Sequence, residues 1–191
     1  VYRTIAIDGV VPFEELNEVM FPQIDNGGYA NFTVTVGNEP AKVYLTKGKH
    51  SISMQVTMGP LKDQYQEIKD VMNRLNKVGM DLKKLTAGST DTNRTWDLDA
   101  YLPDVVPELQ SCADKIDEIY NELEKIGGKT PSYANSLKYA SEMLRKVCKK
   151  PRQLPNKIDK ISSGDGSAAN NLATVISAMV SLPISLDRIY V

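Results

Sequence analysis

Two polar loops of the chain carry aromatic residues beside carboxylate and amide groups. The first is Asp25–Tyr29 (DNGGY), and the second, TNRTWDLDAY, holds the only tryptophan, Trp96, together with Asp97 and Tyr101. An aromatic ring can pack on the apolar C–H face of a pyranose while amides and carboxylates bind its hydroxyls. The candidate sugar-binding residues are therefore Asp25, Asn26, Tyr29, Trp96, Asp97 and Tyr101. In each loop a structural role is the alternative: Tyr29 could enter a core strand, and Trp96 could plug the end of a helical bundle.

Catalytic chemistry has few candidate residues. An enzyme needs a positioned nucleophile or an acid–base pair, and the only histidine, His50, falls on the apolar phase of a strand beside a turn. Asp8, Glu14 and Glu15 crowd together near the first turn, where charged residues usually start a helix or face solvent. We expect no catalytic residue and predict that the protein is not an enzyme.

Metal and cofactor ligands are equally scarce. Asp91, Asp97 and Asp99 lack the alternate spacing and the central glycine of an EF-hand calcium loop. The two cysteines and the histidine do not have zinc-ligand spacing. The stretch GDGSAAN from Gly164 lacks the lysine and the preceding strand of a phosphate-binding loop. We therefore expect no metal and no cofactor.

Cys112 and Cys148 test how two segments of the chain are arranged. If they belong to an antiparallel helical hairpin that turns at residues 127–131, positions equally far from the turn face one another. The two cysteines are nearly equidistant from it. In an oxidising compartment a disulfide between them would stabilise the fold by roughly 3–4 kcal/mol. Two buried free thiols are the alternative.

Apolar residues alternate with polar ones through residues 1–59, which predicts antiparallel strands with one buried face. The alternation is clearest in His50–Met58 and in Asn31–Val36, and further strands are expected at Val1–Ile7 and Val43–Leu45. Asp8-Gly9 follows the first of these segments as a strong turn signal.

From Gly59-Pro60 onward the apolar residues recur every three or four positions, which predicts helices that pack along one face. Four segments show this pattern, at residues 61–82, 102–126, 131–147 and 168–180. Gly127-Gly128 is a typical helix C-cap between the second and the third. Residues 60–182 are thus predicted to form a bundle of about four helices with short connections.

The C-terminal stretch SLPISLDRIYV returns to the alternating pattern. A lone strand is not stable, so we expect residues 183–191 to pair with the sheet of residues 1–59. The bundle of residues 60–182 would then be an insertion whose two ends lie close together. The predicted fold class is α+β, an antiparallel β-sheet with an inserted helical bundle.

Composition limits the partners. A net charge of −1 gives no electrostatic reason to expect nucleic acid. No window approaches the eighteen or so consecutive apolar residues of a transmembrane helix. The chain starts at Val1, without Met, directly in a strand-like run. We therefore expect a fragment or a processed product without a signal peptide.

Several short motifs resemble those of a known family. IDG, a GGY loop, KVYLTKGKHSISMQV and the final ISLDRIYV resemble the second half of a carbohydrate-binding β-jelly-roll module. IAIDGVVPFEELNEVMFP and YLTKGKHSISMQVTMGPL are similar to stretches of extracellular solute-binding proteins, family 1, of carbohydrate ABC-type uptake systems in Gram-positive bacteria. In that family one jelly-roll module carries a helical segment that resembles residues 60–182. The first jelly-roll strands and the two-lobed solute-binding domain have no counterpart here.

The resemblance implies a non-catalytic carbohydrate-binding or accessory module of an exported, cell-surface lipoprotein, with a sugar or oligosaccharide as its ligand. A partial jelly-roll sandwich leaves sheet edges open, so the remainder of a longer polypeptide or a second chain would complete the sheet. A structural or protein–protein interaction module without a sugar site is the alternative. Mixed charge on the outer faces of the first two helices favours a bundle closed on itself.

Overall fold

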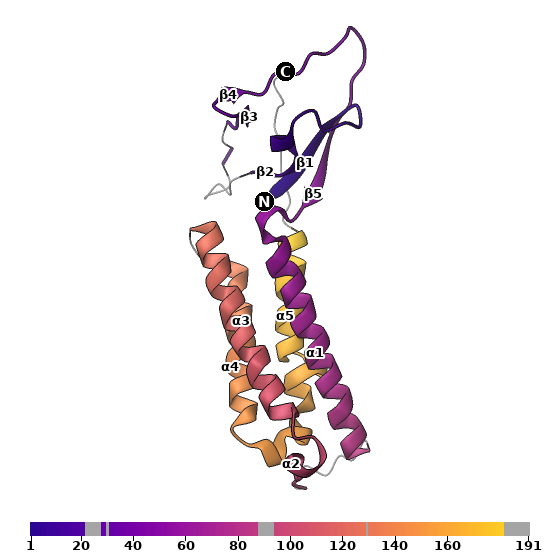
Figure 1. Ribbon diagram of the computed structural model, residues 1–191, viewed down its shortest axis with the longest axis vertical. Helices are drawn as coiled ribbons and strands as arrows, with labels where there is room; N and C mark the ends of the chain where they lie inside the picture. The colour runs from indigo at the N-terminus through magenta and orange to yellow at the C-terminus, as the bar shows by residue number, and fades with distance from the viewer. Residues whose placement is uncertain (22–27, 30, 88–93, 129, 182–191) are drawn as a thin grey trace. The chain divides into compact units, whose positions relative to one another are not determined.

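The computed structural model describes residues 1–21, 28–29, 31–87, 94–128 and 130–181. The chain divides into two compact units, one that comprises Val1–Lys62 and resumes at Val180, and one that comprises Asp63–Met179. The first unit contains the strands and the second contains the long helices (Figure 1). The protein is therefore of mixed class, with small antiparallel sheets and a helical bundle, as the two hydrophobic periods predict.

The larger sheet of the first unit has three antiparallel strands. β1 (Tyr2–Ile7) is the central strand, between β2 (Val19–Met20) and β5 (Ile52–Thr57). β1 and β5 pair along their whole length. Asp8 and Gly9 follow β1 with positive φ angles, so they form the tight turn that the Asp-Gly pair predicts.

A small apolar cluster covers one face of this sheet. Its buried members are Ile5, Leu16 and Val19, and Leu16 comes from the short helix η1 (Glu14–Asn17). Half-buried side chains complete it: Val11, Phe13, Phe21, Val34 and Met54. Ile5 and Met54 are cross-strand partners, so the cluster lies on the face of the sheet that these two residues share.

The same face is open along β5. Ile52 and Val56 lie two residues either side of Met54 and therefore belong to its face of the strand, yet both are substantially exposed. β5 is also an edge strand of the described sheet. The prediction that the apolar side of His50–Met58 is buried is thus only partly correct, because among the described residues the cluster reaches Met54 and no further.

The segment between these strands is less regular than its alternation predicts. β3 (Thr35–Val36) and β4 (Glu39–Pro40) form a separate two-stranded sheet, with Gly37 between them at positive φ. Val43–Leu45, predicted as a strand, lies outside every assigned strand. Alternation alone is insufficient, since a strand also needs a neighbour for its backbone N–H and C=O groups.

Among the described residues, four long helices form the second unit: α1 (Lys62–Thr86), α3 (Val105–Gly127), α4 (Asn135–Cys148) and α5 (Ala168–Val180). α2 (Leu98–Tyr101) is a single turn. Fully buried side chains fill the core of the bundle: Ile68, Leu75, Leu82, Leu109, Ile116, Ile119, Leu123, Leu137, Leu144, Leu154, Ile161 and Leu172. The four helical segments that the sequence predicts are confirmed, because each turns its apolar stripe inward.

α3 and α4 form the predicted antiparallel hairpin (Figure 1). α3 ends at Gly127, and Gly128 follows in the left-handed conformation with φ of 68°, as a helix C-cap requires. Arg145, near the end of α4, forms ion pairs of 2.8 and 2.6 Å with Asp114 and Asp117, in the middle of α3. The two helices therefore run in opposite directions along a shared interface.

Short turns of 3-10 or π-helix complete the described structure: η3 (Gly59–Leu61), η4 (Ser132–Ala134), η5 (Pro151–Lys157) and η6 (Asp159–Ser163). η5 and η6 connect α4 to α5 and bury Leu154 and Ile161. No helix in the described ranges is both long and apolar enough to cross a membrane.

The predicted C-terminal strand, residues 183–191, lies outside the described residues. Its pairing with the sheet of residues 1–59, and with it the insertion of residues 60–182, stay predictions. The first unit includes residues from both sides of the bundle, which is the order along the chain that an insertion requires.

Candidate functional site

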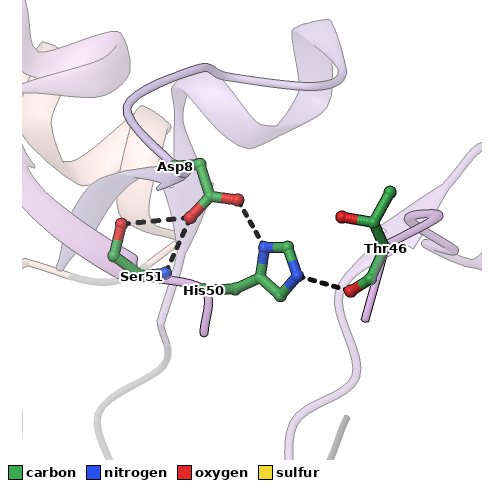
Figure 2. A network of polar contacts seen from close by, with 4 residues as sticks. All are labelled: Asp8, Thr46, His50 and Ser51. Carbon is green, nitrogen blue, oxygen red and sulfur yellow. Dashed lines mark hydrogen bonds and ion pairs between the residues drawn. The ribbon is translucent and has the colours of Figure 1, made fainter. Parts of the chain in front are cut away.

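Asp8 and His50 form a polar network in the first unit (Figure 2). Nδ1 of His50 lies 2.6 Å from Oδ2 of Asp8, and Nε2 lies 2.7 Å from the backbone oxygen of Thr46. The other carboxylate oxygen of Asp8 accepts hydrogen bonds from the backbone N–H of Ser51 at 2.8 Å and from its hydroxyl at 3.3 Å. These four residues, here called the Asp8–His50 clasp, tie the turn after β1 to the residues before β5.

The partners of His50 favour its charged form. Both ring nitrogens face acceptors, so the doubly protonated imidazolium, which donates from both nitrogens, satisfies both contacts. The hydrogen bond to Asp8, and then the one to the Thr46 carbonyl, raise the pKa of His50 above its usual value. The hydrogen bonds from His50 and from the Ser51 backbone lower the pKa of Asp8. The clasp is therefore a charge-assisted contact when His50 is protonated.

The clasp contains the residue types of a serine hydrolase triad without its geometry. In a triad the histidine accepts the proton of the serine hydroxyl, whereas Ser51 donates to Asp8. Nε2 of His50, which would have to accept that proton, instead faces the Thr46 carbonyl. This arrangement fits the structural role that the sequence suggests for His50.

The protonation of His50 in the clasp can be measured directly. His50 is the only histidine, so its ring Cε1–H resonance is unique in a proton NMR spectrum. We expect its titration midpoint to lie above the usual value of 6.5. Asp8→Asn should bring the midpoint down toward about 6.5, since the charged partner is removed. A midpoint at or below 6.5 in the unsubstituted chain would contradict the network.

Linkage gives the sign of the stability effect. The raised pKa of His50 means that its contribution is complete below pH 6.5 and is lost as the pH rises through the folded-state pKa. The lowered pKa of Asp8 means that its contribution is present above pH 3.8 and is lost as the pH falls through the folded-state pKa. His50 and Asp8 therefore both contribute fully to the stability of the fold between pH 3.8 and pH 6.5.

The structure does not bring the sequence-predicted sugar-binding residues into one site within either unit. Asp25 and Asn26 lie outside the described residues. Tyr29 is exposed in the first unit. Trp96, Asp97 and Tyr101 lie at α2 in the second unit, where the last two are exposed.

Trp96 packs into the helical unit and is only 9% exposed. The guanidinium of Arg94 lies 3.9 Å from the centre of its ring, a cation–π contact. The backbone N–H of Trp96 donates to the carbonyl of Arg152 in η5 at 3.1 Å. Burial thus favours the packing alternative for Trp96, whereas Tyr101 still offers an open ring.

Cys112 and Cys148 are both buried, and both are free thiols in this structure. Burial raises the pKa of Cys112 to about 11 and also raises the pKa of Cys148. Neither thiol is therefore a ready nucleophile at neutral pH. A disulfide between them stays a prediction.

A surface hollow of about 480 Å³ lies between α1 and α3. Its charged lining residues are already engaged by one another or by their neighbours. Lys115 bridges Glu67 and Glu118 at 2.7 and 3.0 Å. Arg74 binds Glu108 through two hydrogen bonds of 2.7 and 3.1 Å. The hollow thus lies along a network of ion pairs that holds the two helices together, and none of its described lining residues is aromatic.

A second hollow, of about 360 Å³, lies beside α4 and is called the Tyr139 hollow here. It is lined by Tyr139, Glu142, Met143, Lys146, Gly166 and Asn171. None of these residues belongs to the two polar loops from which the sugar-binding residues were predicted. One feature of the sequence could have indicated this hollow. Tyr139 is an aromatic residue on the outer face of α4, where a polar residue is usual.

The described part of the chain contains no cluster of side chains suited to a metal ion. No group of three or more histidine, cysteine or acidic side chains there is arranged to hold a metal ion. No described residues contradict the expectation of no metal and no cofactor, which stays an expectation.

Residues 63–179 match the family described as bacterial solute-binding protein, 4-helix bundle domain. This range is more than half of the chain and begins and ends with the helical unit. No curated protein and no solved structure matches the chain.

Proposed function

The chain belongs to the bacterial solute-binding proteins that contain a four-helix bundle domain, and we propose from this membership that it is a non-catalytic, carbohydrate-binding accessory module. The observation that carries the proposal is the match over the entire helical unit. The larger protein would be an exported solute-binding protein of a sugar ABC transporter. A bundle of this kind would hold or present the sugar near the part of that protein that delivers it for uptake.

A binding role agrees with the chemistry of the described residues. The Asp8–His50 clasp lacks the geometry of a hydrolase triad, and burial raises the pKa of both thiols. Exposed tyrosine rings, by contrast, are present at Tyr29 and Tyr101. Such rings suit the C–H faces of sugars. Tyr29, with Asp25 and Asn26, and Tyr101, with Asp97, are therefore retained as proposed binding residues.

The sheet unit is proposed to be a partial jelly roll that other strands complete. The open face beside Ile52 and Val56 and the edge position of β5 in the described sheet support this, since an uncovered edge is usually protected or paired. Residues 183–191 would supply one strand, and the rest of a longer polypeptide would supply the others. The location at the surface of a Gram-positive cell, as a lipoprotein, follows from the same resemblance.

A structural or protein–protein interaction module is the second candidate function. The first unit exposes several large apolar side chains, among them Val10, Tyr44 and Val56. Exposed apolar residues of this kind often mark a surface that another protein covers. In that case the chain would have no sugar site of its own.

Titration with saccharides separates the two functions. The full chain, labelled with ¹⁵N, would be titrated with a panel of methyl glycosides and disaccharides while its amide spectrum is followed. The proposed function predicts saturable shifts with at least one sugar. A panel without any shift, together with concentration-dependent self-association in sedimentation, would instead favour the interaction module.

A further inference from the structure

The outer face of α4 carries an open aromatic ring. Tyr139, Met143 and Lys146 are spaced by four and three residues and so lie on one side of the helix. The buried side of α4 is different, and includes Leu137, Ala140 and Leu144. Tyr139 is 63% exposed, and Met143 beside it is half-buried. The ring and the thioether together form an apolar wall of the Tyr139 hollow.

Another part of the lining is a backbone turn with an amide side chain, formed by Gly166 and Asn171. Gly166 has a positive φ of 71°, a conformation in which glycine is favoured. The side-chain nitrogen of Asn171 donates to the backbone oxygens of Gly166 and Ser167 at 3.1 and 3.0 Å. Among the described residues no donor contacts Oδ1 of Asn171. Its acceptor oxygen is therefore held in place and available.

The Tyr139 hollow contains one acidic and one basic side chain. Glu142 and Lys146 are exposed, and in the described part of the chain neither forms an ion pair. One carboxylate acceptor and one ammonium donor thus flank the ring, and their formal charges cancel. In the hollow between α1 and α3, by contrast, the charged side chains form ion pairs with one another or with their neighbours.

We propose that the Tyr139 hollow binds a neutral pyranose sugar, with its C–H face on the ring of Tyr139 and its hydroxyls on Asn171, Glu142 and Lys146. Hydroxyl groups both donate and accept, and the hollow offers two acceptors and one donor beside an apolar surface. Its volume of about 360 Å³ lies near the lower end of the roughly 300–1,000 Å³ of small-molecule sites. That size suits a mono- or disaccharide. The inference rests on the proposed carbohydrate-binding function and names a site for it.

The test compares exposed tyrosines. Tyr139→Ala removes the ring, Tyr139→Phe keeps it, and Tyr44→Ala is the matched control, because Tyr44 is 91% exposed and is not among the proposed sugar-binding residues. The best sugar from the panel of methyl glycosides and disaccharides would be titrated into each full-length variant, with circular dichroism as the check on folding. We expect Tyr139→Ala to weaken binding about tenfold or more, and the other two to change it less than about threefold.

The outcomes separate the site from the function. If a sugar binds the unsubstituted chain and binds Tyr139→Ala equally well, the hollow is not the site, but the proposed function stands. If Tyr139→Phe loses as much affinity as Tyr139→Ala, ring stacking is not the basis of binding and the inference fails. If no sugar binds the unsubstituted chain, both the inference and the proposed function fall.

Discussion

Replacing Ile116 with alanine is expected to lower the free energy of unfolding of the helical unit by about 2–5 kcal/mol. Ile116 has no exposed surface and lies near the middle of α3, on the face that carries Leu109 and Leu123. Alanine would remove apolar atoms from a close-packed core, and the neighbouring side chains would fill the resulting cavity only in part. Urea unfolding followed by the circular dichroism of the helices measures this change.

Ile126→Ala is the matched control for this prediction. Ile126 lies on the same helix but is 37% exposed, so the same substitution should cost about 1 kcal/mol or less. Equal losses for the two variants would mean that the buried face of α3 is assigned incorrectly. The bundle would then need another arrangement of its helices.

Gly79→Ala is expected to destabilise the helical unit by about 1–3 kcal/mol. Within a helix this substitution ordinarily stabilises by about 1 kcal/mol, because glycine has more backbone freedom to lose. Here a Cβ on Gly79 would overlap Oγ of Ser162 and lie 3.0 Å from its Cβ. η6 therefore packs against α1 at a distance that only glycine permits, and the same unfolding measurement gives the loss.

Two further variants test the cause. Gly127→Ala makes the same change at the end of α3, where a Cβ would meet nothing within 4 Å, and it should leave stability unchanged or slightly higher. Ser162→Gly combined with Gly79→Ala should recover part of the loss, because the overlapping atoms are gone. A stabilising effect of Gly79→Ala alone would show that η6 does not pack closely on α1.

The helices of this protein could be predicted from its amino-acid sequence alone. The hydrogen bonds of a helix are local and its buried face repeats at a fixed period. The apolar stripe through Leu109, Ile116 and Leu123 therefore predicts both a helix and its inner face. The glycines at 127 and 128 predict where α3 ends, since the left-handed conformation favours glycine. The alternation in residues 1–59 likewise predicts β1 and β5, whose partners are antiparallel strands.

The contacts between distant segments, by contrast, could be seen only in the folded chain. Asp8 and His50 are 42 positions apart, and neither residue alone indicates the clasp. Phe32–Val36 has the alternation of a longer strand but forms only the short β3, because a strand depends on a partner that lies elsewhere in the chain. Trp96 stands in a polar loop and is nevertheless buried, whereas Tyr139 is left open on a helix. Such non-local packing has no fixed period along the sequence, so spacing alone could not predict it.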